Sequence, residues 1–292
     1  MKKLTIAGIG ELLWDIYQEV EEIGGAPINF TYHITALGAK GIPISTIGRD
    51  DRGKKAIAEL EKRGLDVSAI SVVDNHATGY VSATIDGEGV ASYNFPDKVA
   101  WDHLQVNNYV KMIQSKLDAV CFGSLAQRSK GSRVAIYRFL DSLNTQTVRV
   151  FDVNLRQNFY SRKIIESSLR RTDILKLNDE ELQILARLLD FKETGKEGLT
   201  VLVDRYNLRM AILTRGSNGS VLMTPNNFSD HPGIATSHIV DTIGAGDSFT
   251  AATTIGYLQG LELDDINEKA NKLAAYVCSQ QGAMPSIPEF LK

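Results

Sequence analysis

Short apolar runs alternate along the chain with longer segments in which apolar residues recur every three or four positions. The short runs have the length of buried strands, and the longer segments have the spacing of helices that turn one face toward a core. The pattern predicts strands at 4–10, 43–48, 119–124, 148–154, 174–178 and 210–216, and helices at 28–38, 51–63, 105–116, 132–143, 161–171, 179–189, 245–259 and 265–281. This alternation is typical of a doubly wound α/β domain, in which helices cover both faces of a mostly parallel sheet.

Two segments do not follow this alternation. Residues 79–95 contain two runs of alternating apolar and polar residues around the sequence DGEG at 86–89, which is the pattern of a β-hairpin. Residues 12–23 are also typical of extended structure. We therefore expect one domain over 1–292 with a small β lid formed by about 12–24 and 74–98, and a small meander at the edge of the sheet is the alternative.

Composition and charge narrow the class of protein. The 292 residues carry a net charge of −3, which argues against a nucleic-acid partner because such proteins usually have a basic surface. No apolar segment approaches the ~20 residues that span a bilayer, and Glu11 and Asp15 interrupt the N-terminal apolar run that would otherwise imitate a signal peptide. With only two cysteines, a disulfide framework is not expected. We therefore expect a cytoplasmic protein with no membrane partner.

Several known site motifs do not fit the sequence. Gly8 and Gly10 follow a strand, but Leu13 stands where a dinucleotide fingerprint needs a third glycine. The segment 48–55 has the spacing of a phosphate-binding P-loop, but it ends in lysine instead of Ser or Thr and contains two acids. The five histidines have no zinc-ligand spacing, and no G-x-S-x-G elbow is present.

The sequence DTIGAGDSF at 241–249 is a stronger candidate. It follows the apolar stretch 234–240, which is expected to be a strand, and it opens the predicted helix at 245–259. Small residues at the start of a helix leave several backbone N–H groups open to one anion, and the helix dipole adds positive charge there. A carboxylate beside such an anion site can accept a proton from an attacking alcohol. The alternative is that Asp247 only complements the helix dipole.

The same nine residues resemble the C-terminal signature of the PfkB, or ribokinase-like, sugar kinases. The sequence GGAPINFT at 24–31, followed by Gly38 and Gly48, is similar to the N-terminal signature of this family. The resemblance extends from the first strand to GAMPSIP at 282–288, and it is greatest to the fructokinase branch because that branch shares the Gly-Gly-Ala-Pro-x-Asn pattern. It implies an ATP-dependent kinase that phosphorylates a primary hydroxyl of a sugar.

The resemblance also implies roles for individual residues around the sugar. Asp247 would be the general base, and the amides of Gly244, Ala245 and Gly246 would form the anion hole. Asp15, Gly25 and Asn29 would hold the sugar, although Asn29 could instead cap the helix that follows. Arg156, from the D-x-N-x-R segment at 152–156, would be a cation near the sugar or the γ-phosphate, with a surface salt bridge as the alternative.

For the nucleotide and the cations, the resemblance implies a second set of residues. Asn178 and Glu181 match the N-x-x-E motif that acts through Mg²⁺, although they could be an ordinary helix N-cap. The loop with Thr214, Gly216 and Gly219 would carry ATP or be a plain hairpin turn, and Asn271 would line the adenine pocket or be exposed. A monovalent cation, usually K⁺, would be bound by Asp241, Ile243, Val277, Gln280, Gly282 and Ser286.

The identity of the sugar depends on the lid. We expect D-fructose or a related ketohexose, and ribose, another furanose, a nucleoside or 2-keto-3-deoxygluconate are alternatives. Candidate specificity residues are Trp14, Tyr93, Asn94, Phe95 and Trp101, although Trp101 could belong to the core. A sugar-binding regulator without catalysis is a further alternative, and exposed lid strands make a homodimer plausible.

Overall fold

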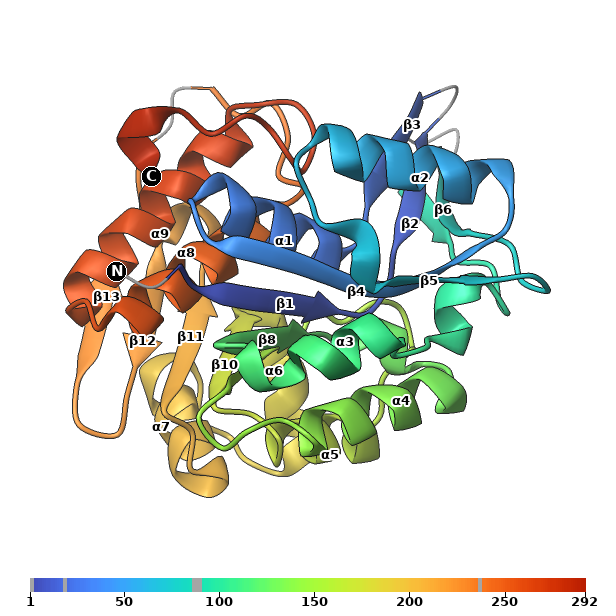
Figure 1. Cartoon of the computed structure of the whole chain (residues 1–292). Coiled ribbons are helices and arrows are strands. Elements are labelled where there is room, and N and C mark those ends of the chain that lie inside the picture. The colour runs from blue at the N-terminus through green and yellow to red at the C-terminus, as the bar shows by residue number, and fades with distance from the viewer. Residues whose placement is uncertain (1–2, 18–19, 86–90, 236–237) are drawn as a thin grey trace.

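A nine-stranded sheet forms the centre of the molecule, counted over the residues that the structure describes (Figure 1). The structure is a computed structural model that describes residues 3–17, 20–85, 91–235 and 238–292. The strands run in the order β13-β12-β11-β10-β9-β8-β1-β4-β5. Their bounds are β1 Thr5–Ile9, β4 Lys40–Gly48, β5 Ile70–Val73, β8 Ala119–Phe122, β9 Val148–Asp152, β10 Ile174–Asn178, β11 Met210–Thr214, β12 Ser220–Met223 and β13 Phe228–His231. All neighbours from β5 to β11 pair in parallel, and β12 and β13 pair antiparallel at one edge.

Helices cover both faces of this sheet (Figure 1). One layer consists of α1 Ala26–Ala36, α2 Asp51–Lys62, α8 Ala245–Gln259 and α9 Leu263–Cys278. The opposite layer consists of α3 Asn108–Ile113, α4 Lys130–Asp141, α5 Arg162–Leu169, α6 Asp179–Leu189 and α7 Gly195–Tyr206. Separate buried apolar clusters fill the space on the two faces. The doubly wound α/β fold predicted from the sequence is therefore confirmed.

A second, four-stranded sheet projects from this core. Its order is β3-β2-β6-β7, with bounds β2 Leu13–Tyr17, β3 Val20–Gly24, β6 Gly79–Ile85 and β7 Ala91–Asn94. The antiparallel register places Asp15 opposite Glu22 and Trp14 opposite Ile23. The predicted small sheet is confirmed, whereas the predicted turn at 86–89 lies outside the described residues.

The sequence pattern missed several elements. Helix α7 begins with two glycines in its first four residues, which lowers helix propensity, and β13 is a short edge strand of sequence FSDH without an apolar run. The strand expected over 234–240 is absent from the described part of that stretch. There the N–H groups of Val240 and Asp241 donate to the Cys278 carbonyl instead of to a neighbouring strand.

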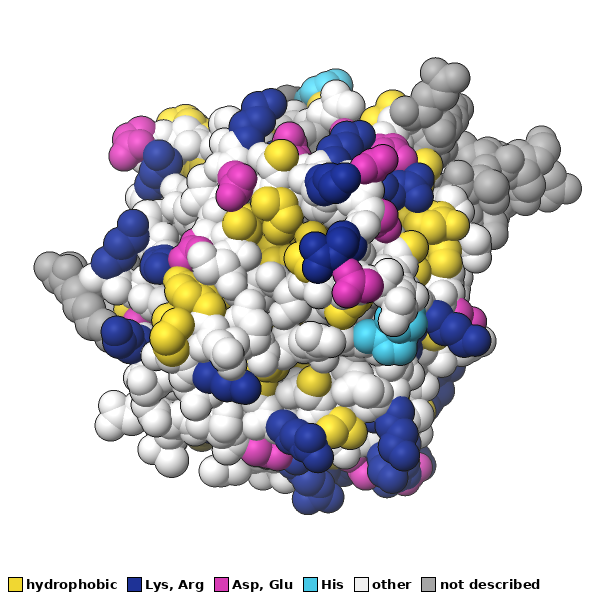
Figure 2. Space-filling model, turned by 45° about the vertical axis from the view of Figure 1, so that its right-hand side comes forward, with side chains coloured by type: hydrophobic (Ala, Val, Ile, Leu, Met, Phe, Trp, Pro, Cys, Tyr) yellow, Lys and Arg dark blue, Asp and Glu magenta, His cyan; other side chains and the backbone are white. Residues whose placement is uncertain are grey.

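Charged side chains of both signs are interspersed on the face that Figure 2 shows, among the described residues. This mixture agrees with the small net charge of −3. Over the described part of the chain, the helices are all too short or too polar to cross a bilayer.

Candidate active site

The N-terminus of α8 presents backbone N–H groups that have no partner among the described residues. Gly244 is the N-cap and has a φ of 79°, which is a left-handed conformation that favours glycine. The N–H groups of Gly246 and Asp247 donate no hydrogen bond to any described residue, and that of Ala245 reaches the Thr242 carbonyl only at 3.3 Å. Together with the helix dipole, these amides can bind an anion.

Asp247 lies in the first turn of α8, where α1 approaches it. The amide Nδ2 of Asn29 donates to Asp247 Oδ2 at 2.8 Å, and only 5% of Asn29 is exposed. Asn29 lies inside α1, whose N-cap is Gly25. The alternative in which Asn29 caps this helix is therefore wrong, and the helix begins two residues before its predicted start.

The carboxyl group of Asp247 has an unusual electrostatic environment. Burial, followed by the negative charge of Asp152, raises its pKa to about 6, while the hydrogen bond from Asn29 and the positive charge of Lys176 oppose this rise. A carboxylate with such a pKa is mostly deprotonated at neutral pH. It is also a stronger base than an ordinary aspartate, as a general base requires.

A buried ion pair lies beneath the α8 N-terminus. Lys176 Nζ is 3.1 Å from Asp152 Oδ1, and the Thr250 hydroxyl donates to Asp152 Oδ2 at 2.9 Å. A methyl group built on Gly246 would lie 2.9 Å from Lys176 Nζ, so the ammonium group lies against Gly246. Nearby carboxylates, chiefly Asp152, hold the pKa of Lys176 above its usual value in spite of burial. The candidate site therefore contains a positive charge next to the amides that could bind an anion.

Two further carboxyl groups, those of Glu11 and Asp15, have raised pKa values, and the negative charge of Asp247 contributes to the rise for Glu11. Glu11 is 2% exposed; its Oε1 accepts from the Ala26 N–H at 3.3 Å, and its Oε2 has no partner among the described residues. Burial is the largest cause that raises the pKa of Glu11 to about 7 and that of Asp15 to about 6. Gly25 must lack a side chain because a methyl group there would collide with the Glu11 carbonyl.

Arg156 is exposed, and its Nη1 donates to the carbonyl of the adjacent Leu155 at 3.0 Å. No ion pair involving Arg156 is found in the described part of the chain, so the structure does not contain the surface salt bridge considered as an alternative. Its positive charge nevertheless lowers the pKa values of Glu11, Asp15 and Asp247. Arg156 therefore lies close enough to these carboxyl groups for its charge to stabilise their ionised forms.

Asn178 and Glu181 form a capping box at the start of α6. Asn178 Oδ1 accepts from the Glu181 N–H at 2.8 Å, and Glu181 Oε2 accepts from the Asn178 N–H at 2.9 Å. Glu181 Oε1 accepts from the Leu155 N–H at 2.8 Å. Both carboxylate oxygens are thus engaged by the backbone, as the N-cap interpretation predicts, and any contact with Mg²⁺ has to use their remaining lone pairs.

The loop between β11 and β12 contains two glycines in different surroundings. A methyl group built on Gly216 would meet nothing within 4 Å, whereas one built on Gly219 would collide with the carbonyl of His231. Gly219 is therefore required by the β-hairpin itself, and Gly216 is the glycine with an open side. The Thr214 hydroxyl makes a long contact of 3.4 Å to the Leu177 carbonyl.

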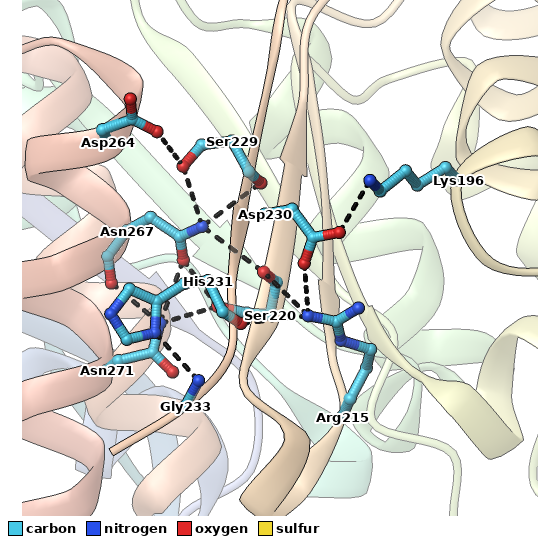
Figure 3. Close-up of polar contacts among 10 residues, drawn as sticks. All are labelled: Lys196, Arg215, Ser220, Ser229, Asp230, His231, Gly233, Asp264, Asn267 and Asn271. Atoms are coloured by element: carbon cyan, nitrogen blue, oxygen red, sulfur yellow. Dashed lines mark hydrogen bonds and ion pairs between the residues drawn. The ribbon is translucent and has the colours of Figure 1, made fainter.

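Asn271 belongs to a buried polar network that joins α9 to the β12–β13 hairpin (Figure 3). Its Nδ2 donates to Ser220 Oγ at 2.8 Å and to the Asn267 carbonyl at 2.9 Å. The alternative of an exposed Asn271 is wrong, since 8% of it is exposed. Nearby, a mostly apolar cavity of about 530 Å³ is lined by Ile234, Ala235, His238, Lys272, Ala275, Tyr276, Ser279, Phe290 and Leu291.

The residues expected to bind a monovalent cation lie on two adjacent segments. Asp241 joins them, because its Oδ1 accepts from the Ile243 N–H at 2.9 Å and its Oδ2 accepts from the Gly282 N–H at 3.2 Å. The carbonyls of Ile243, Gln280 and Gly282 accept no hydrogen bond from the described residues. The two remaining expected ligands are placed differently: the Val277 carbonyl accepts from the Gln280 N–H, and Ser286 is exposed.

Sequence reasoning missed Glu11 and Lys176 as site residues. Both are charged residues within otherwise apolar runs, GIGELL and ILKLN, and this interruption is the signal that could have found them.

Among the expected specificity residues, Trp14 and Trp101 are buried, and Phe95 packs at the edge of the Phe159 ring. Asn94 is exposed, and the side chain of Tyr93 lies outside the described residues.

Comparison with known proteins extends these findings. A family model described as pfkB family carbohydrate kinase matches residues 10–289. An uncharacterized sugar kinase of Pyrococcus horikoshii is 29% identical over 98% of this chain and 94% of its own length. Its structure in complex with ATP covers 97% of this chain and 95% of its own, with a TM-score of 0.84 and 28% identity.

Two fructokinases are more distant. The fructokinase of Escherichia coli is 25% identical over 91% of this chain and 88% of its own length. A fructokinase of Vibrio cholerae O395, solved with fructose, ADP and potassium ion bound, is 21% identical over 99% of this chain and 96% of its own, with a TM-score of 0.84, which shows a shared fold. Because the family model spans nearly the whole chain, this protein belongs to the pfkB family of carbohydrate kinases.

Proposed function

We propose that this carbohydrate kinase transfers the γ-phosphate of ATP to a primary hydroxyl of D-fructose or a closely related ketohexose. The observation that carries the proposal is the position of Asp247 beside the free N–H groups at the start of α8, where Asn29 holds its carboxylate. The sugar preference is supported by the fructokinase relatives and by the Gly-Gly-Ala-Pro-x-Asn pattern at 24–29.

In the proposed mechanism, Asp247 removes the proton from the sugar hydroxyl as that oxygen attacks the γ-phosphate. A general base of this kind contributes roughly 10²–10⁴-fold to the rate. The amides of Gly244, Ala245 and Gly246, with the Lys176 ammonium group next to them, stabilise the charge on the transferred group. Asp15, Gly25, Asn29 and Arg156 bind and orient the sugar.

The nucleotide would bind near the start of α8, between the β11–β12 loop and the end of α9, so that its γ-phosphate reaches the amides of the anion site. The space beside Gly216 is open to the nucleotide, because a methyl group there would meet nothing within 4 Å, and the apolar cavity beside α9 suits a purine base. Mg²⁺, bound with ATP, would neutralise phosphate charge, and Asn178 and Glu181 would act on it through water because the backbone already engages their oxygens. Thr214, Gly219 and Asn271 would shape the pocket.

A monovalent cation such as K⁺ fits the segments joined by Asp241. The carbonyls of Ile243, Gln280 and Gly282 accept no hydrogen bond from the described residues, so they can supply the oxygen ligands that such a cation needs. Val277 and Ser286 would supply further oxygens. Because Gly282 and Ile243 flank the glycine turn of the anion site, a cation there would add positive charge to it.

The small sheet would act as a lid over the sugar and exclude water, which otherwise competes for the phosphoryl group. One domain over 1–292 carries both sheets in this proposal, and the exposed strands of the lid could pair two copies into a homodimer. Both cysteines are free, as expected for a cytoplasmic protein.

The test is ADP release from MgATP with fructose, ribose, tagatose, adenosine or 2-keto-3-deoxygluconate, each with and without K⁺. We expect the highest kcat/KM with fructose and a higher rate with K⁺. A higher kcat/KM with ribose, a nucleoside or the keto-acid would reassign the substrate. Sugar binding measured by calorimetry without any ADP release would contradict catalysis and favour a sugar-binding regulator.

A further inference from the structure

Three consecutive carbonyls after α9 each accept a hydrogen bond from a side chain of another element. His33 Nε2 bonds the Ala283 carbonyl, Arg63 Nη1 donates to that of Met284, and Tyr32 Oη donates to that of Pro285. All three distances are 2.9 Å. Tyr32 and His33 belong to α1, and Arg63 follows α2, so these two helices together hold the segment 283–285 (Figure 1). We call the three side chains the carbonyl clamp.

The protonation state of His33 follows from its partner. A backbone carbonyl can only accept a hydrogen bond, so Nε2 must carry the proton. His33 is 0% exposed, and burial lowers its pKa to about 4, which keeps the ring neutral. Its Nδ1 has no partner within the described residues. Burying an unpaired nitrogen is unfavourable, so an apolar side chain would suit this position better if His33 served only to fill the core.

The carbonyl held by His33 lies against the anion site. A methyl group built on Gly244 would lie 2.5 Å from the Ala283 carbonyl oxygen and 2.7 Å from Ala283 Cα. The Ala283 peptide therefore forms the surface on which the first glycine of the α8 turn rests. Four residues before His33 and on the same face of α1, Asn29 donates to Asp247. One helix thus positions the base directly and the glycine turn through Ala283.

We propose that His33 is a positioning residue for phosphoryl transfer, which holds Ala283 against Gly244 and thereby fixes the amides of the anion site. The catalytic part of this inference rests on the proposed kinase function. A displacement of about 1 Å at a reacting centre can cost ~10²-fold in rate. Loss of the His33 bond should therefore lower kcat while the contacts that bind the sugar remain.

Two substitutions separate the hydrogen bond from simple packing. His33→Leu fills the space without a donor, and His33→Gln places an amide Nε2 near the position of the imidazole Nε2. Thr31→Val is the matched control, because the Thr31 hydroxyl is equally buried but bonds only carbonyls of its own helix. We expect a decrease in kcat of about ten- to a hundredfold for His33→Leu, with the sugar KM changed less than threefold. His33→Gln should recover most of the rate, and Thr31→Val should keep it.

Amide hydrogen exchange tests the clamp without relying on activity. Peptides covering 241–249 and 281–287 should exchange faster in His33→Leu than in the wild type, and at nearly wild-type rates in His33→Gln and Thr31→Val. Unchanged exchange in both segments of His33→Leu would overturn the inference, as would equal loss of kcat in His33→Leu and Thr31→Val. If the wild type released no ADP with any sugar, the proposed function would fail, whereas the exchange rates would still decide the clamp.

Discussion

At the scale of single residues, three carboxyl groups of the candidate site lose contact with water when the chain folds. Glu11, Asp15 and Asp247 come from different segments, and burial is the largest cause of the raised pKa of each. Neighbouring acids raise these pKa values further: Asp247 acts on Glu11, and Glu22 and Asp241 act on Asp15. The positive charge of Arg156 opposes the rise for Glu11, Asp15 and Asp247. A cluster of acids that holds protons near neutral pH costs stability, and such clusters are typical of functional sites.

The pH dependence of catalysis should follow Asp247. Its pKa of about 6 in the free protein means that the basic form decreases as the pH falls below that value. We expect kcat/KM to decrease about tenfold per pH unit below pH 6, because this parameter reports the free enzyme. Steady-state rates between pH 5 and 8 would measure it, and a constant kcat/KM down to pH 5 would show that Asp247 is not the base.

The contribution of Glu11 to the free energy of unfolding should fall as the pH rises, whereas that of an ordinary salt-bridged acid increases with pH. Its pKa of about 7, above the usual 4.5, means that the folded state retains a proton that the unfolded state releases. The stabilisation is therefore complete below pH 4.5 and is lost as the pH rises through 7. Glu11→Gln keeps a neutral group and should raise the free energy of unfolding at pH 8 by up to about 3 kcal/mol.

Denaturant unfolding at pH 4.5 and pH 8 would measure this effect. At pH 4.5 the variant and the wild type should have nearly equal stability. Glu61→Gln, on the exposed side of α2, is the control and should change stability by less than about 0.5 kcal/mol at both pH values. A Glu11→Gln protein that is less stable than the wild type at pH 8 would contradict the buried, proton-retaining carboxyl group.

At the scale of elements, α8 has glycines in left-handed conformations at both ends. Gly244 begins it with a φ of 79° and Gly260 ends it with a φ of 71°. The surroundings differ, because a methyl group would meet Ala283 at the first position and nothing within 4 Å at the second. The start of the helix is thus built for close approach, and its end is an ordinary C-cap.

Substituting each of the two glycines with alanine should separate these roles. Gly260→Ala should cost only the backbone strain of a positive φ, about 1 kcal/mol, and should leave kcat unchanged. Gly244→Ala adds a collision with Ala283 and should also lower kcat, because it displaces the amides of the anion site. Thermal unfolding and steady-state kinetics would measure both effects, and an active Gly244→Ala enzyme would contradict the close packing of this turn.

Elements with strong patterns were predictable from the sequence, and those set by tertiary contacts were not. The apolar runs that form β1, β8 and β10 lie in parallel pairs inside the sheet, so their apolar composition is sufficient to predict them as strands. In contrast, the chain at 238–241 bonds the end of α9, a partner that no local pattern encodes. The clamp donors Tyr32 and Arg63 were missed for the same reason, because their acceptors lie more than 200 residues away.

At the scale of the whole molecule, the candidate site lies where three parts of the fold meet. Asp15 comes from the small sheet, Asp247 from the start of α8, and Lys176 from the central sheet. The family resemblance named residues in all three parts, among them Asn178 at the end of β10, but it did not name Lys176. A site assembled in this way should respond to its substrate through the relative position of the two sheets.

Sugar binding should therefore slow hydrogen exchange in the small sheet. We expect protection of β2 and β3 when fructose is added, because closure of a lid buries their backbone groups, with no change in β13 at the distant edge of the central sheet. Exchange measured by mass spectrometry with and without fructose would test this, and equal exchange in β2 and β3 would indicate that the small sheet is not a lid.

The most direct test of the proposed chemistry is the turnover of Asp247→Asn. This change removes the base but keeps a side chain of the same size, so sugar binding should persist while kcat falls by about 10²–10⁴-fold. Asp265→Asn is the matched control, because Asp265 is also an acid in the first turn of a helix but is exposed. Wild-type kcat in Asp247→Asn, or an equal loss in both variants, would mean that Asp247 only complements its helix dipole.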